Sequence, residues 1–158
     1  MAKSENTAHT RWASLLEPDA QTLEELRRAG NGATQLTQCG VRWDAVVIAP
    51  LERGLASLDA LRLSRDAGYP VIADYARHEL IVQVPAGTAF YDCASVQGVR
   101  TLTRGSWLLV PLGRFGADAA AWLSRPTPAG ARYVDPARLR EAVHTADEER
   151  GEHAHASC

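Results

Sequence analysis

The chain has 158 residues, which is near the usual size of one domain and enough to bury one hydrophobic core. Hydrophobic residues make up 46% of it and charged residues 23%, a composition that argues against a disordered or a membrane protein. The formal net charge of −2 lacks the strong positive excess with which many proteins attract phosphate backbones, but it leaves room for a local basic patch.

The pattern of apolar residues predicts neither a membrane segment nor a signal peptide. No apolar run approaches the roughly 20 residues needed to span a bilayer, and the opening MAKSENTAHTRW has no continuous apolar stretch. Cys39, Cys93 and Cys158 are far apart and form no C-x-x-C pair, which argues against a disulfide framework and a zinc knuckle. We therefore expect a cytoplasmic protein with reduced thiols.

The N-terminal part of the chain predicts two helices after a flexible start. Residues 1–10 are polar and expected to be flexible, and Trp12 begins a short helix that packs its ring against the body. Residues 17–32 form the second helix. There Thr22 and Glu25 have the spacing of a capping box, and two glycines supply the stop.

The middle of the chain predicts a buried strand, a helix and then several short strands. Residues 43–49 are almost all apolar, which is typical of a strand covered on both faces. Residues 51–70 place four leucines on one stripe of an amphipathic helix. Further strands are predicted at residues 70–74, 79–85, 99–102 and 106–111.

The C-terminal part predicts two helices and a tail. The alanine-rich residues 116–123 favour a short helix, and residues 135–146 favour a helix with Asp135 as its cap and Pro136 at its first position. Residues 147–158 are charged and without periodicity, so we expect a disordered tail whose removal leaves the melting temperature nearly unchanged.

The element order predicts an α/β (α+β) protein in which helices pack on a mixed sheet, with a single domain over residues 11–146. The apolar pattern also predicts one contiguous buried cluster. Its expected members are Trp43, Val46, Ile48, Leu55, Leu58, Ile72, Leu80, Val82, Trp107 and Leu109.

Common catalytic and nucleotide-binding motifs are absent from the sequence. There is no G-x-x-x-x-G-K-[ST], no G-x-G-x-x-G after a strand, no G-x-S-x-G and no H-E-x-x-H. His153 and His155 form an H-A-H pair in the tail, which we interpret as solvated because a structural zinc site needs four ligands.

A polar cluster lies between the strands at 70–74 and 79–85. Asp74, His78 and Glu79 are close in sequence there, and a histidine beside a carboxylate can act as a general base. Turns also collect such residues for hydrogen bonding, and a catalytic site needs a second converging group. We therefore interpret the cluster as structural.

Four segments occur in an order that resembles a known family: DAVVIAP at 44–50, DAGYPVIAD at 66–74, ARHELIVQVPAGT at 76–88 and VRTLTRGSWLLVP at 99–111. Over residues 41–115, about half of the chain, the sequence is similar to the bifunctional DNA primase/polymerase family in its small bacterial relatives. The resemblance implies an RRM-like core. In the family, carboxylates hold metal ions for nucleotidyl transfer.

The resemblance places His78 where the family has a histidine that contacts the phosphates of an incoming nucleotide. Asp44 lies at the opposite end of its strand from the family's acidic pair, on the order of 15 Å away, and cannot replace it. The residues at the family's acid positions cannot ligate a metal ion: Ala49, Pro50 and Leu51, and then Arg100 or Thr101.

We therefore expect a binding or regulatory module that has lost catalysis, with no catalytic residue, no metal ligand and no cofactor. Its expected partners are a weakly bound nucleotide or nucleic acid, or another protein, and no membrane. A phosphate site is expected at Arg77, His78 and Arg104. Two alternatives stay open: an active metal-dependent nucleotidyltransferase with its acids elsewhere, and a protein-interaction module without a nucleotide site.

Overall fold

The structure, a computed structural model, describes residues 11–156, so the flexible segment expected at residues 1–10 lies outside the described residues. The helices are η1 (Trp12–Leu15), α1 (Ala20–Ala29), η2 (Gly30–Ala33), α2 (Leu51–Ala60), α3 (Ala89–Cys93) and α4 (Pro136–His155). The strands are β1 (Thr34–Gln38), β2 (Trp43–Ile48), β3 (Val71–Asp74), β4 (Glu79–Pro85), β5 (Val99–Leu102), β6 (Trp107–Pro111), β7 (Gly116–Ala117) and β8 (Ala120–Ser124).

The strands form a six-stranded sheet in the order β5-β2-β4-β3-β8-β7 and a separate two-stranded sheet of β1 and β6. The α+β class is confirmed, but the described strand pairs are all antiparallel where we expected a mixed sheet. The reason lies in β4. Strands β2 and β3 run in the same direction, as a strand–helix–strand unit requires, but β4 inserts between them and pairs with both.

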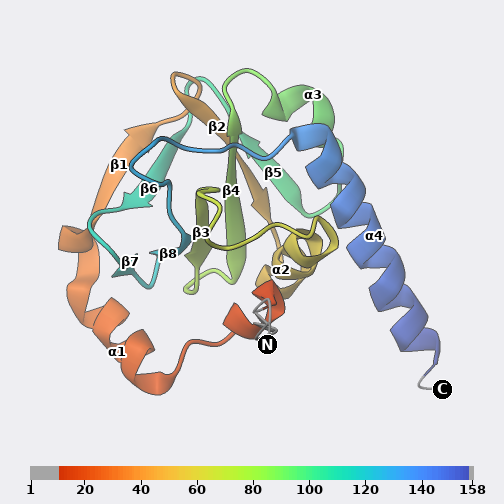
Figure 1. Cartoon of the computed structure of the whole chain (residues 1–158), viewed down its shortest axis with the longest axis horizontal. Helices are drawn as coiled ribbons and strands as arrows, with labels where there is room; N and C mark the ends of the chain where they lie inside the picture. The colour runs from red at the N-terminus through yellow and green to blue at the C-terminus, as the bar shows by residue number, and fades with distance from the viewer. Residues whose placement is uncertain (1–10, 157–158) are drawn as a thin grey trace, which may run out of the picture.

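Apolar side chains cover both faces of the central sheet, as the sequence of β2 predicted. Val46 and Ile48 point toward α2, α4 and η1, whereas Ala45 and Val47 point toward the two-stranded sheet. Figure 1 shows α2 and α4 to one side of the central strands and β1 with β6 to the other. The protein is therefore three-layered: helices, central sheet, two-stranded sheet.

The predicted core is buried at eight of its ten positions, but it forms two clusters instead of one because the sheet separates them. Trp43 and Ile72 belong to the cluster beneath β1 and β6, and the other six belong to the helical cluster. Trp107 was predicted wrongly. Its side chain is 55% exposed, and Leu109 is half-buried.

The helix predicted at residues 116–123 is wrong: this segment forms β7 and β8, joined by a tight turn. Alanine has high helix propensity, but tertiary pairing overrides that preference because β8 completes the sheet beside β3. The cap of α1 also differs from the prediction. Asp19, and not Thr22, is the N-cap, and its carboxylate accepts hydrogen bonds from the Thr22 amide (2.9 Å) and hydroxyl (2.8 Å).

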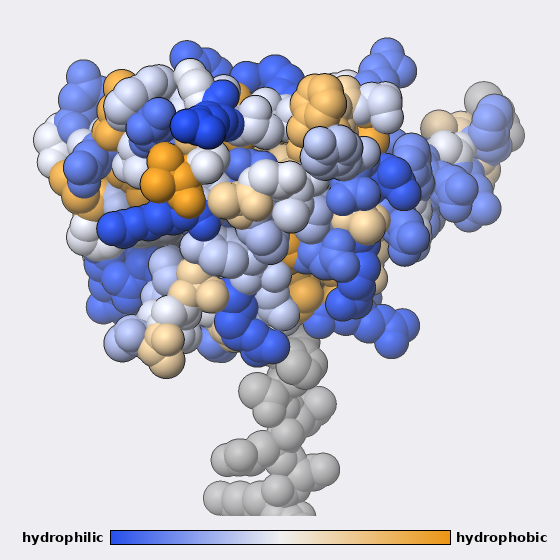
Figure 2. Space-filling model, turned by 90° about the horizontal axis from the view of Figure 1, so that it is seen from above, coloured by the Kyte–Doolittle hydropathy of each residue, from blue (hydrophilic) through white to orange (hydrophobic). Residues whose placement is uncertain are grey.

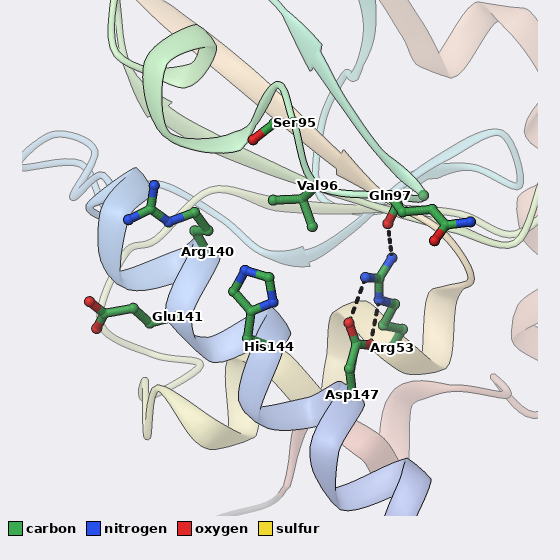
Figure 3. A pocket seen from close by; sticks show the side chains of 9 residues that line it. Arg53, Ser95, Val96, Gln97, Arg140, Glu141, His144 and Asp147 are labelled. Carbon is green, nitrogen blue, oxygen red and sulfur yellow. Dashed lines mark hydrogen bonds and ion pairs between the residues drawn. The ribbon is translucent and has the colours of Figure 1, made fainter.

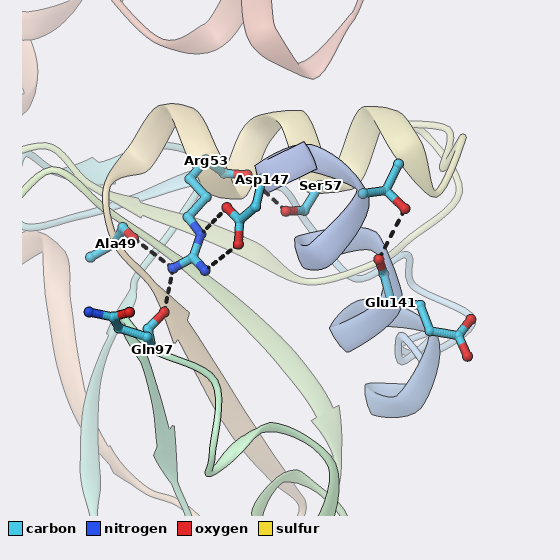
Figure 4. Close-up of polar contacts among 7 residues, drawn as sticks. Ala49, Arg53, Ser57, Gln97, Glu141 and Asp147 are labelled. Atoms are coloured by element: carbon cyan, nitrogen blue, oxygen red, sulfur yellow. Dashed lines mark hydrogen bonds and ion pairs between the residues drawn. The ribbon is translucent and has the colours of Figure 1, made fainter. Parts of the chain in front are cut away.

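The tail expected at residues 147–158 is helical as far as His155, because α4 continues well beyond residue 146. Asp147 holds the helix to the body. Its carboxylate accepts hydrogen bonds from Nε and Nη2 of Arg53, each 2.7 Å long, and the Arg53 Nη1 donates to the carbonyl oxygens of Gln97 (2.6 Å) and Ala49 (3.3 Å) (Figure 4). Arg53 thus ties α2, α4 and the β5 end of the sheet together.

Candidate functional site

The three residues of the predicted phosphate site lie at opposite ends of the sheet. Arg77 and His78 are in the turn between β3 and β4, next to the pair Asp74–Glu79. Arg104 follows β5 at the far end. Because β4 spans seven residues, the two ends are on the order of 20 Å apart. One phosphate therefore cannot contact all three side chains, and binding at either end stays a prediction.

Arg77 has a structural partner in this turn. Its backbone amide donates to Oδ1 of Asp74 (2.9 Å), and its guanidinium lies 3.2 Å from Oδ2 of the same residue. The Asp74 side chain is 5% exposed, so Arg77 balances a nearly buried carboxylate. This agrees with our interpretation of the turn cluster as structural.

The positions that the resemblance assigns to acids do lie near one another, at the His78 end of the sheet. Ile48 pairs with Leu80, and Val47 pairs with Arg100. There the Arg100 guanidinium forms a 2.7 Å ion pair with Glu79. Arg100, one of the two residues that the resemblance aligns with a family acid, is thus a cation paired with the neighbouring carboxylate.

Asp44 has a structural role at the start of β2. Its side chain is fully buried, and Oδ2 accepts hydrogen bonds from the amides of Gly87 (2.9 Å) and Ala89 (3.3 Å). It thereby fixes the loop that leads into α3, while Oδ1 has no hydrogen-bond partner. Within residues 11–156, no group of three or more His, Cys, Asp or Glu side chains could hold a metal ion.

Two stretches without acidic residues come together where β1 pairs with β6. Residues 26–43 and residues 99–117 contain six arginines and no aspartate or glutamate: Arg27, Arg28, Arg42, Arg100, Arg104 and Arg114. Glu24 pairs with Arg28 and Glu79 pairs with Arg100, so charge partners from outside these stretches neutralise two of the six. Three of the remaining four, Arg42, Arg104 and Arg114, lie in the segments next to the two-stranded sheet.

We call this surface the basic ribbon and define it as Thr34–Gln38, Trp107–Pro111, Arg42, Arg104 and Arg114. Arg42 and Arg104 belong to neighbouring turns at one end: a Cβ on Gly40 would lie 2.5 Å from the Arg104 Cα. Arg114 lies at the other end, beyond the bond from the Leu112 amide to the Ala33 carbonyl. The cations therefore bracket the strand pair.

The outer face of the basic ribbon carries three apolar side chains and one glutamine. Leu36 is paired with Leu109, and Gln38 with Trp107, so these four side chains share one face. Leu36 is 57% exposed and Trp107 is 55% exposed, while Val41 in the next turn is also exposed. Figure 2, which views the molecule from above Figure 1, shows hydrophobic residues scattered among hydrophilic ones on that face. Aromatic, aliphatic and arginine side chains are thus accessible together.

This surface was not predicted from the sequence, although one of its two features, the lack of acidic residues, is visible there. The lack of acids in residues 26–43 and 99–117 can be read from the sequence, but the whole-chain charge of −2 conceals it. Strand β1 was not predicted because Thr34–Gln38 alternates weakly, and the pairing with β6 joins segments far apart in the chain.

The two described cysteines are unpaired and buried, one on each side of the sheet. Burial raises the pKa of the Cys39 and Cys93 thiols from 9.0 to about 11, and the Asp44 carboxylate adds to the effect at Cys39. Both thiols therefore stay protonated near neutral pH, which makes them poor nucleophiles.

No family model, curated protein or solved structure matches this chain. Among residues 11–156, no helix has the length and apolar character needed to cross a bilayer.

Proposed function

We propose that this protein is a nucleic-acid-binding module of the cytoplasm, which holds single-stranded DNA or RNA on the basic ribbon and does not itself transfer nucleotides. The observation that carries the proposal is the meeting of two acid-free, arginine-bearing stretches around an exposed tryptophan. Arginine guanidinium groups bind phosphate with charge-assisted hydrogen bonds. Exposed aromatic rings stack with unpaired bases.

A single strand fits this surface better than a duplex. Trp107 and Leu36 offer flat and apolar contacts on the outer face, and an unpaired base can lie on them. A duplex hides the faces of its bases and would use the arginines alone. Arg42 and Arg104 at one end and Arg114 at the other place cations where a backbone crossing the strand pair would run.

Loss of nucleotidyl transfer is supported by the residues at the sheet end near His78. Ala49 and Pro50 carry no carboxylate, and Arg100 is paired with Glu79. Two-metal transfer needs carboxylates that converge on ions about 3.5–4 Å apart. In the proposal, the likeness to the primase/polymerase family therefore concerns the fold and nucleic-acid contact, and not catalysis.

Fluorescence anisotropy with a labelled single-stranded oligonucleotide tests the proposal. Trp107→Ala should weaken binding roughly 5- to 150-fold, because one stacked base contributes about 1–3 kcal/mol. Arg42→Gln with Arg104→Gln should weaken binding and lower the slope of log affinity against log salt by about one per lost phosphate contact. Arg138→Gln, an exposed cation on α4, is the matched control.

The same titrations separate the alternatives. His78→Asn tests the turn between β3 and β4. Asparagine tolerates the φ of 56° that His78 adopts there. If only this variant weakens binding, the basic ribbon is the wrong surface. Absence of binding at low salt would refute the proposal and favour a protein-interaction module. Metal-dependent extension of a primer would contradict the loss of catalysis.

A further inference from the structure

A groove on the helical side of the molecule is separate from the basic ribbon. It lies between α4 and residues 95–98, and its volume is about 800 Å³ (Figure 3). Arg140 and His144 line it from α4, Ser95 and Gln97 line it from the loop, and Arg53 with Asp147 closes one end. The central sheet separates this groove from β1 and β6.

The groove contains hydrogen-bonding groups with no partner in the fold. Arg140 and His144 are four residues apart on α4 and therefore lie one turn apart on the same face. Within residues 11–156, neither side chain forms a hydrogen bond or an ion pair, and the hydroxyl of Ser95 forms none either. Their donors are free to bind a ligand.

The walls that present these donors are fixed by Arg53. Its guanidinium bonds both Asp147 carboxylate oxygens, and Nη1 donates to the Gln97 carbonyl, so helix and loop cannot separate without breaking charged hydrogen bonds. Arg53 is only 10% exposed. The site is thus preorganised, which reduces the entropy lost when a ligand binds.

Two arginines and two carboxylates line the groove: Arg53 and Arg140, and Glu141 and Asp147. Arg53 neutralises the Asp147 carboxylate, and the Glu141 side chain points away from the loop in Figure 3. Arg140 is then the arginine of the groove that forms no ion pair within residues 11–156. Ser95 stands across from Arg140 and His144 (Figure 3). Arg140 and His144 offer N–H donors from the helix and Ser95 offers a hydroxyl from the loop, and several donors together suit a phosphate, whose oxygens can each accept hydrogen bonds.

We propose that this groove binds the phosphate group of a small phosphorylated ligand, with Arg140, His144 and Ser95 as its donors. Val96 is the one apolar side chain among the residues that line the groove, so the rest of the ligand is polar, as in a sugar phosphate. The volume leaves room for such a remainder beside the phosphate. A 5′-phosphate at the end of a nucleic acid offers the same chemistry.

Isothermal titration calorimetry on the full chain tests this site, with inorganic phosphate, ribose 5-phosphate and ribose as probes. The phosphate-bearing probes should bind and ribose should not. Arg140→Gln with His144→Gln should reduce affinity about tenfold or more, because charge-assisted hydrogen bonds are the strong ones. Arg138→Gln removes a charge from the same helix outside the groove and should have little effect.

Circular dichroism establishes that the variants fold. Arg140→Lys keeps the positive charge but loses the planar set of guanidinium donors, so it should retain part of the affinity. A 5′-phosphorylated oligonucleotide that binds here while ribose 5-phosphate does not would assign the phosphate to a nucleic-acid end. The site would be refuted if Arg138→Gln and the double variant Arg140→Gln, His144→Gln bound the phosphate-bearing probes with equal affinity. Absence of heat with every phosphate-bearing probe would refute it too. Equal binding of ribose and ribose 5-phosphate would refute phosphate recognition.

Discussion

Because Arg53 and Asp147 form an ion pair, the free energy of unfolding should depend on whether a truncation of α4 keeps Asp147. A truncation that removes residues 147–158 deletes Asp147, whereas one that removes residues 149–158 keeps it. The Arg53 side chain is 10% exposed and that of Asp147 is 40% exposed, so the pair is partly buried and two strong hydrogen bonds disappear with Asp147.

The expected cost follows from this burial. Removing one partner of a fully buried pair costs about 3–5 kcal/mol. Water that reaches Asp147 screens the charge, and Arg53 keeps its bonds to two carbonyl oxygens, so we expect about 2 kcal/mol. For a domain of this size, that corresponds to a fall of roughly 4–8 °C in the melting temperature.

Thermal unfolding of both truncations, followed by circular dichroism, measures the difference. The shorter deletion removes the exposed contact between Arg150 and Glu52, whose nitrogen and oxygen are 4.0 Å apart, and should shift the melting temperature little. Asp147→Asn in the full chain should fall between the two truncations. Equal melting temperatures for the two truncations would refute the role of Arg53 and restore the prediction of a dispensable tail from residue 147.

Three further substitutions or conditions test the packing. Gly54→Ala should destabilise the protein by about 1–2 kcal/mol in urea although alanine favours helices, because the new Cβ would lie 2.5 Å from the Leu80 Cβ in the core. Asp44→Ala should cost about 2 kcal/mol and speed amide exchange in α3, because the Gly87 and Ala89 amides lose their acceptor. Asp44→Asn, which keeps an acceptor, should cost less. The raised pKa of Cys39 and Cys93 predicts stability that is complete below pH 9 and declines toward pH 11, since the unfolded chain releases these protons first. Replacing both cysteines with alanine should make that alkaline decline shallower, and an unchanged decline would contradict the assignment.

Local chemistry alone determined several elements of this protein. The apolar run of β2 predicted a strand covered on both faces, and the stripe of leucines predicted α2 against the sheet. Asp135 and Pro136 correctly marked the start of α4. In each case the information lies within a few residues, because side-chain periodicity and helix caps act over one or two turns.

Two predictions were wrong for the same reason: that the last helix ends at residue 146, and that residues 116–123 form a helix. Asp147 is ordered by Arg53, which is 94 positions away in the sequence, and β8 is a strand because β3 offers it an unpaired edge. Neither partner can be recognised from the segment itself. Long-range pairing thus overrode local preference.

The tertiary structure also decided where the candidate sites lie. The sequence suggested one phosphate site of Arg77, His78 and Arg104. The register of β2, β4 and β5 puts Arg104 at the opposite end of the sheet from the other two. Pairing of β1 with β6 exposed Trp107, which its apolar sequence had placed in the core. The sequence determined which residues carry charge and aromatic surface, and the pairing of distant strands determined which of them a ligand can meet together, because contacts between strands depend on register and not on proximity in the chain.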